Sequence, residues 1–283
     1  MSNGSPDRGA GALPDALTAT LLELARQAAA AGAAVLAGRN AAELDVSNKG
    51  DSGDWVTAFD LAAESAVRDV ITAARPFDTI TGEEGGTVLP AEPSGYRWSI
   101  DPLDGTTNFI RNIVYYGTSV AVADPDGVWL AGVVNAPALG REYYALRGHG
   151  AWLEENGRRT QLAGPVAGRT GQILATGFSY DPDVRAEQAD AMGSLMDGFA
   201  DVRRLGSAAL DLCLVADGTH DAYGERGLNE HDFAAGALIA EEAGCWVRRP
   251  RLNSPLAGGP SDDDRLAAWT CAATLELSGK FPL

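Results

Sequence analysis

Asp101 and Asp104 stand three residues apart at the end of an apolar run whose side chains alternate like those of a half-buried strand. A proline between the two carboxylates interrupts the hydrogen-bond ladder of the strand, and Gly105 directly after them is typical of a turn. Thr106 can then begin a helix, and the first backbone N–H groups of a helix bind anions. Mg2+ prefers carboxylate oxygens, and phosphate is held by metal and N–H groups together. The pattern therefore predicts a Mg2+-phosphate site.

The same spacing also occurs in ordinary acidic turns between a strand and a helix. The full run from Asp101 to Phe109 is more specific, and it resembles the first signature of the inositol monophosphatase family, the lithium-sensitive, Mg2+-dependent phosphatases. Residues 231–244 are similar to the second signature of this family, and residues 54–60 and 82–86 are similar to two shorter upstream motifs. The four motifs occur in the order of the family, and the resemblance extends from about residue 15 to near the C-terminus.

The resemblance implies two or three Mg2+ ions per site. The carboxylates of Glu83 and Asp101, with the backbone carbonyl of Leu103, would hold one ion. Asp101, Asp104 and Asp232 would hold a second ion, and Glu83 would help to bind a third. Taken alone, Asp232 is also explained as an ordinary acid at the start of a helix.

The resemblance also implies how water attacks the phosphate ester. Water on Mg2+ is a poor nucleophile unless a base lies close by, and the motif match gives that role to Asp54 and Thr106. Thr106 would pass its hydroxyl proton towards Asp54 while its oxygen accepts a hydrogen bond from the attacking water. The backbone N–H groups of Gly105 and Thr106 would hold the phosphate oxygens. Asp54 alone also fits the simpler role of a turn cap.

Four further residues resemble the elements with which the family contacts substrate hydroxyls, namely Gly206, Ser207, Ala208 and Glu225. Glu225 is the best candidate to accept hydrogen bonds from a polyol, because an unpaired polar group in the pocket would be costly. A surface acid on a turn is the alternative interpretation of Glu225.

The chain departs from the family pattern at two positions beside the site. His231 stands where the family usually has Trp, and Gly224 stands where an aromatic residue is frequent. We expect His231 to be an additional polar contact to the substrate, with a packing substitution beside the metal site as the alternative. A small Gly224 and a polar His231 would reshape the pocket that binds the leaving alcohol. The sequence therefore does not identify this alcohol.

Composition limits the class of protein. The chain has 283 residues, of which 45% are hydrophobic, so it can bury a sizeable core. Its net charge of −17 argues against unaided binding to nucleic acid or to an anionic membrane. The three cysteines are widely spaced, which predicts buried reduced thiols in a cytoplasmic protein. We expect neither a secretory signal nor a membrane span.

Apolar residues recur at helical spacing over residues 17–35 and 61–74, and residues 46–54 between these helices are predicted to be a loop. Antiparallel strands are expected between residues 119 and 153. From residue 173 onward strands and helices alternate, as in an α/β layer, with a helix expected over residues 184–199.

These patterns predict a disordered tail over residues 1–14, an N-terminal α+β domain over residues 15–163 with most metal ligands, and a C-terminal α/β domain over residues 164–283 with Asp232 and the substrate contacts. The resemblance implies a layered αβαβα sandwich of the inositol monophosphatase and fructose-1,6-bisphosphatase type. It also implies that the site lies between the two halves.

The leading hypothesis is a Mg2+-dependent phosphomonoesterase that acts on a small polyol, cyclitol or sugar phosphate. A histidinol-phosphate or 3′-phosphonucleotide phosphatase on the same fold is an alternative. A non-catalytic, metal-binding regulatory or interaction protein is another. The resemblance further implies a homodimer and inhibition by Li+.

Overall fold

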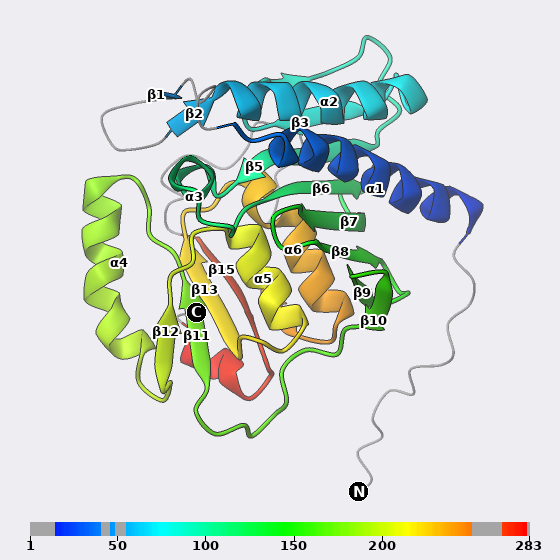
Figure 1. Cartoon of the computed structure of the whole chain (residues 1–283). Helices are drawn as coiled ribbons and strands as arrows, with labels where there is room; N and C mark the ends of the chain where they lie inside the picture. The colour runs from blue at the N-terminus through cyan, green and yellow to red at the C-terminus, as the bar shows by residue number, and fades with distance from the viewer. Residues whose placement is uncertain (1–14, 41–45, 49–54, 251–267, 282–283) are drawn as a thin grey trace, which may run out of the picture.

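The computed structural model describes residues 15–40, 46–48, 55–250 and 268–281. Within these residues, the strands form one eight-stranded sheet, one five-stranded sheet and a short antiparallel hairpin of β1 (Val46–Asn48) and β2 (Trp55–Thr57). Figure 1 shows the two sheets with helices outside and between them.

The eight-stranded sheet has the strand order β10-β9-β8-β7-β6-β5-β3-β4. Its pairs are antiparallel except for β3 and β5, which run parallel. In chain order the strands are β3 (Thr79–Gly82), β4 (Gly86–Val88), β5 (Arg97–Asp104), β6 (Gly117–Ala123), β7 (Trp129–Ala136), β8 (Arg141–Leu146), β9 (Ala151–Glu155) and β10 (Arg158–Gln161).

The five-stranded sheet has the order β12-β11-β13-β15-β14. Strand β11 runs parallel to β12 and β13, whereas β15 runs antiparallel to β13 and β14. The strands are β11 (Ile173–Thr176), β12 (Asp201–Arg203), β13 (Ala222–Arg226), β14 (Trp246–Arg248) and β15 (Trp269–Ala273). The predicted domain division at residues 163 and 164 falls between the two sheets, and it stays a prediction.

Helices α1 (Ala16–Ala37) and α2 (Ala58–Ala74) cover the outer face of the first sheet. Each presents one apolar stripe, as an amphipathic surface helix does. Alternating strand residues point to opposite faces of this sheet. Val120 and Val122 on β6 pack with α1 and α2, whereas Ala121 and Ala123 belong to the core on the other face.

Helices α5 (Ala208–Ala216) and α6 (Glu230–Glu242) form the middle layer between the two sheets. Every residue of α5 is buried, and α6 is buried from Phe233 to Ala240. A helix between two sheets has no solvent face, which explains why α5 is apolar except for Asp211 and why residues 233–240 of α6 are all apolar or glycine. Their core includes Val134 of the first sheet and Tyr223 of the second, so the two sheets share one core.

Helix α4 (Pro182–Leu195) covers the outer face of the second sheet, where Leu195 packs with Leu174 and Ala222. Figure 1 shows α4 apart from the other helices, at the far side of this sheet. The layers are therefore helix, sheet, helix, sheet, helix. The predicted layered α+β fold is confirmed.

Local predictions differ from the structure in two places. The expected loop over residues 46–54 contains strand β1, which pairs with β2. The helix expected over residues 184–199 runs from Pro182 to Leu195. The Asp181 carboxylate accepts hydrogen bonds from the first free backbone N–H groups of this helix. A proline at the first helical turn is favourable, because its missing N–H group would be unpaired there.

Gly224 on β13 does not line the predicted pocket. A Cβ atom at Gly224 would come within 2.4 Å of the Phe281 ring. Phe281 directly follows the short 3-10 helix η2 (Leu277–Lys280), and its ring stacks on Trp246 with centroids 6.2 Å apart. The aromatic group beside this strand therefore comes from the C-terminal segment and packs in the outer core of the second sheet.

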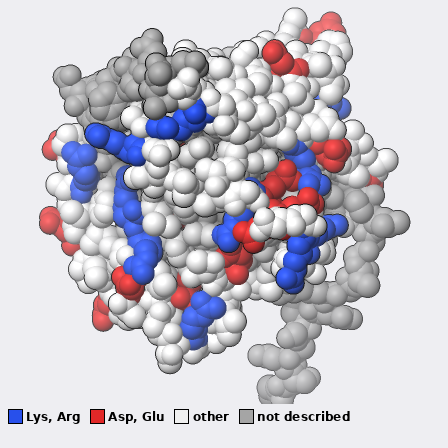
Figure 2. All heavy atoms as spheres, in the orientation of Figure 1, with Lys and Arg blue, Asp and Glu red and all other residues white. Residues whose placement is uncertain are grey.

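The surface in the orientation of Figure 1 carries Lys and Arg side chains interspersed with Asp and Glu (Figure 2). On this face the net negative charge does not form a uniform acidic field. In the described part of the chain, no helix has the length and apolar character that a membrane crossing requires. The three cysteines are free, and Cys213 and Cys271 are buried.

Phe281→Ala should lower the free energy of unfolding by about 3 kcal/mol, because it removes a buried ring that Gly224 cannot replace. Urea denaturation would measure this. Leu275→Ala is the matched control, since Leu275 is 77% exposed, and it should change stability by less than about 0.5 kcal/mol. Equal losses in both variants would contradict this account of Gly224.

Candidate active site

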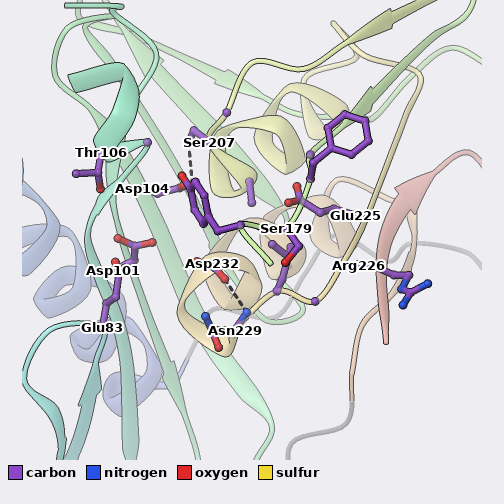
Figure 3. A pocket seen from close by; sticks show the side chains of 18 of the residues that line it. Glu83, Asp101, Asp104, Thr106, Ser179, Ser207, Glu225, Arg226, Asn229 and Asp232 are labelled. Atoms are coloured by element: carbon purple, nitrogen blue, oxygen red, sulfur yellow. Dashed lines mark hydrogen bonds between the residues drawn. The ribbon is translucent and has the colours of Figure 1, made fainter. Parts of the chain in front are cut away.

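The end of β5 carries a β-bulge that exposes two carboxylates to one cavity. Asp101 pairs with Ser119 on β6, and the register then shifts so that Asp104 pairs with Gly117. Within the bulge, the backbone N–H of Leu103 donates to Asp101 Oδ1 over 3.0 Å. Bulges re-aim side chains next to active sites. In Figure 3, Asp101 and Asp104 both point towards the cavity.

The cavity lies between the two sheets and has a volume of about 460 Å3. It is lined by most of the residues predicted from sequence: Glu83, Asp101, Leu103, Asp104, Gly105, Thr106, Gly206, Ser207, Ala208, Glu225 and Asp232. Figure 3 shows Glu83, Asp101 and Asp104 on one side of it, with Glu225 and Asp232 on the other. Asp54 lies outside the described residues, and His231 is not part of the lining.

Asp104 joins the first sheet to the middle layer. Its Oδ2 accepts hydrogen bonds from Ser207 Oγ at 2.8 Å and from the backbone N–H of Ala209 at 2.7 Å. Ser207 is the N-cap of α5, so the carboxylate lies at the positive end of this helix. These contacts fix Asp104 against the opposite wall of the cavity.

Asp232 lies in the first turn of α6 and takes part in its capping. Its Oδ2 accepts from the backbone N–H of Asn229 at 2.6 Å, which forms a capping box at the start of the helix. Next to it, Glu230 forms an ion pair with Arg97 on β5. The start of α6 is thereby attached to the strand that bears Asp101 and Asp104.

Burial among like charges perturbs both carboxylates of β5. Burial, together with the negative charges of Glu83, Asp104 and Asp232, raises the pKa of Asp101 well above its ordinary value. Burial and the charge of Asp232 raise the pKa of Asp104 to about 8, although hydrogen bonds from Ser207 and Ala209 oppose this. Several carboxylates held close together are the donor set that suits a divalent metal ion.

Thr106 lines the cavity at the first position of α3 (Thr106–Arg111). Its Oγ1 hydroxyl lies 3.2 Å from Asp60 Oδ1 and 3.1 Å from the carbonyl oxygen of Leu103, both of which can accept its proton. Asp60 is fully buried and also accepts hydrogen bonds from the hydroxyl and the N–H of Thr57. Burial raises the pKa of Asp60. The carboxylate behind Thr106 in the described chain is thus Asp60.

Sequence reasoning missed Asp60, although it lies in the same motif as Asp54. The signal was available: Thr57 and Asp60 have the spacing of a capping box, which turns the aspartate back towards the start of the helix. That turn is what brings Asp60 close to Thr106.

Glu225 lies on β13, across the cavity from the bulge of β5. It accepts a hydrogen bond from the Tyr223 hydroxyl at 2.8 Å, and burial raises its pKa to about 7. A Cβ atom at Gly177 would lie 2.0 Å from Glu225 Oε2, so only glycine leaves room for this carboxylate. Gly177 begins a second set of lining residues that the sequence did not reveal, Gly177, Phe178, Ser179, Tyr180, Asp181 and Arg204.

The sequence argument predicted that His231 contacts the substrate. The structure places its imidazole beside the carboxylates of Glu83 and Asp101, and His231 is not among the residues that line the cavity. The substrate contact stays a prediction.

A comparison with known families finds that residues 17–273 match the model of the inositol monophosphatase family. The chain belongs to the inositol monophosphatase family. The match covers the bulge of β5, the first turn of α6 and all of the residues that line the cavity.

Individual relatives carry two kinds of name. The chain is 41% identical over 260 residues to inositol-1-monophosphatase SuhB of Mycobacterium tuberculosis H37Rv, covering 87% of this chain and 88% of the relative. It is 41% identical over 229 residues to a protein of Pseudomonas aeruginosa named Nus factor SuhB, covering 77% and 82%. The solved Mycobacterium tuberculosis SuhB structure has a TM-score of 0.75 at 34% identity and covers 93% of this chain and 94% of that one.

In metal-free buffer, the free energy of unfolding should decrease as pH rises from about 6.5 to 8. The native pKa of Asp104, about 8, lies above its ordinary value of 3.8, so the native state binds a proton that the unfolded state has released. The slope per group is at most about 1.4 kcal/mol per pH unit. Urea denaturation in EDTA at several pH values would measure it.

Asp104→Asn should flatten this slope, because the amide does not titrate. Asp190→Asn is the matched control, since Asp190 is exposed on α4 and should leave the slope unchanged. If Asp104→Asn retains the full slope, the titration of Asp104 is not what lowers the stability.

Proposed function

We propose that this family member is a Mg2+-dependent phosphomonoesterase that hydrolyses a small polyol, cyclitol or sugar phosphate. The observation that carries the proposal is the carboxylate cluster in the cavity wall, with Thr106 beside it and the buried Asp60 behind Thr106. Such a cluster is costly without cations, and a hydroxyl–carboxylate pair is suited to moving the proton of a nucleophile. Family membership supports the same reaction.

The residues of this chain fit the metal that the family implies. Glu83 and Asp101 with the Leu103 carbonyl would hold one ion, and Asp101, Asp104 and Asp232 would hold another. When bound, Mg2+ would neutralise the charge of the phosphate and lower the pKa of water.

Thr106 and Asp60 would activate the water. The Thr106 hydroxyl would pass its proton to Asp60 while its oxygen accepts a proton from the attacking water. The raised pKa of Asp60 makes it a better proton acceptor than an ordinary aspartate. In-line attack would then break the phosphorus–oxygen bond to the alcohol. We therefore propose for Asp60 the role that the sequence predicted for Asp54.

The second wall of the cavity would hold the alcohol. The N–H groups of Gly105 and Thr106 are proposed to contact the phosphate, and Glu225 would accept hydrogen bonds from substrate hydroxyls. Gly206, Ser207 and Ala208 would lie beside the sugar or cyclitol ring. A histidinol-phosphate or 3′-phosphonucleotide substrate is the alternative on the same fold. The homodimer, cytoplasmic location and Li+ inhibition remain predictions of the resemblance.

A second candidate function is a non-catalytic interaction protein, which the name Nus factor of the Pseudomonas aeruginosa relative favours. The net charge of −17 argues against unaided RNA binding, although it does not oppose a protein partner. The two functions differ in turnover, which is directly measurable.

Phosphate release with Mg2+ should be strong for one member of a panel of inositol phosphates, sugar phosphates, histidinol phosphate, fructose bisphosphate and a 3′-phosphonucleotide. Asp104→Asn should abolish it, because the second ion would lose one of its three carboxylates. Absence of turnover on every ester, together with stoichiometric capture of a protein partner, would favour the second function instead.

Thr106→Ala should lower kcat about 100-fold or more, because the water loses its route for proton transfer. Thr106→Ser keeps the hydroxyl and is the matched control, which should retain most activity. The double variant of Thr106→Ala with Asp60→Asn should be little worse than the single ones, since both act on one proton. Near-full activity of Thr106→Ala with Mg2+ would disprove the proposed proton route.

A further inference from the structure

His231 is the second residue of α6, and its backbone is fixed next to Asp101. The Ser119 hydroxyl donates to the His231 carbonyl oxygen over 3.4 Å, and Ser119 is the cross-strand partner of Asp101. The neighbouring Glu230 forms the ion pair with Arg97 on β5. The first turn of α6 is therefore attached to both β5 and β6, and this keeps the imidazole beside the acid cluster.

The imidazole and two carboxylates form a compact set of possible ligands. In the described residues, one ligand atom each from Glu83, Asp101 and His231 lie within 4.8 Å of one another. Opposite ligands of a bound transition-metal cation are about 4.2 Å apart, at bonds of about 2.1 Å. Small movements of these three side chains would therefore bring all three ligand atoms within bonding distance of one ion.

The imidazole of His231 is largely buried and lies beside the acids. The His231 side chain is 13% exposed, and Asp101 is buried. His231 Nε2 lies 3.6 Å from Asp232 Oδ1, which is longer than a hydrogen bond, so Asp232 does not fix the ring.

The chemistry of the ring differs from that of the tryptophan usual at this position. An indole N–H is a donor only, whereas a neutral imidazole offers a lone pair to a metal. Mg2+ prefers oxygen ligands, and imidazole favours first-row transition cations. An added nitrogen ligand would therefore change which cation the site prefers.

We propose that His231 is a nitrogen ligand to the cation held by Glu83 and Asp101, and that it raises the affinity of this site for transition cations such as Co2+ or Zn2+ relative to its affinity for Mg2+. This inference rests on the cation site of the proposed function, but it requires no turnover. It assigns His231 a role different from the substrate contact expected from sequence.

Titration calorimetry with Co2+ alone and with Mg2+ alone, on the full chain without substrate, tests the preference. His231→Asn should lower Co2+ affinity about tenfold or more while Mg2+ affinity changes less than about threefold. His231→Trp, which restores the usual family residue, should have the same effect and guards against misfolding of the first variant. His149→Asn, in the turn between β8 and β9, is the matched control and should change neither affinity.

Proton NMR of the Co2+-loaded protein identifies the ligand directly. A coordinated imidazole gives an exchangeable N–H signal that the paramagnetic ion shifts far from the normal range. This signal should be present in the parent and His149→Asn proteins and absent from both His231 variants. Co2+ binding without the signal, or with unchanged affinity in the His231 variants, would overturn the inference and leave the proposed phosphatase intact. Failure to bind either cation would overturn both.

Discussion

The structure depends on keeping several carboxylates together in the wall of one cavity, where Asp101 is buried and its neighbours are partly buried. Asp101 and Asp104 are presented by one bulged strand end, and both have raised pKa values because like charges and burial oppose ionisation. Such a group is stable only where the surrounding layers hold it. This is why the first sheet, the second sheet and the middle helices all meet at the same point.

The middle helices supply most of that support. Helix α5 donates its N-cap hydroxyl and a backbone N–H to Asp104, and α6 is attached to β5 through Arg97 and Glu230. These contacts connect the starts of α5 and α6 to the strand that carries the acids. The arrangement favours positioning over flexibility, which matches a reaction in which a charged ester and a water must be held in line.

Much of this arrangement was predictable from sequence, because the acids of the two signatures lie at strand ends and helix starts. The bulge was not predictable in detail, since it depends on the register between β5 and β6. The capping box of Asp60 was visible in the sequence, but its contact with Thr106 was missed because it joins residues 46 positions apart. Gly177 and Arg204 were missed because they directly follow β11 and β12, and these strands bring them to the cavity only once the second sheet has formed. Phe281 could not be assigned because the ring that fills the space at Gly224 lies 57 residues later in the chain.

The strand order of the second sheet also bears on synthesis at the ribosome. Strand β13 pairs on one side with β11, which is made earlier, but its other edge pairs with β15, the last strand of the described chain. Until residues 269–273 have been translated, that edge and the apolar surface awaiting Phe281 remain uncovered. An unpaired strand edge in an unfinished chain is a point at which aggregation begins. The nascent protein thus has a vulnerable interval that ends only when its C-terminal segment docks.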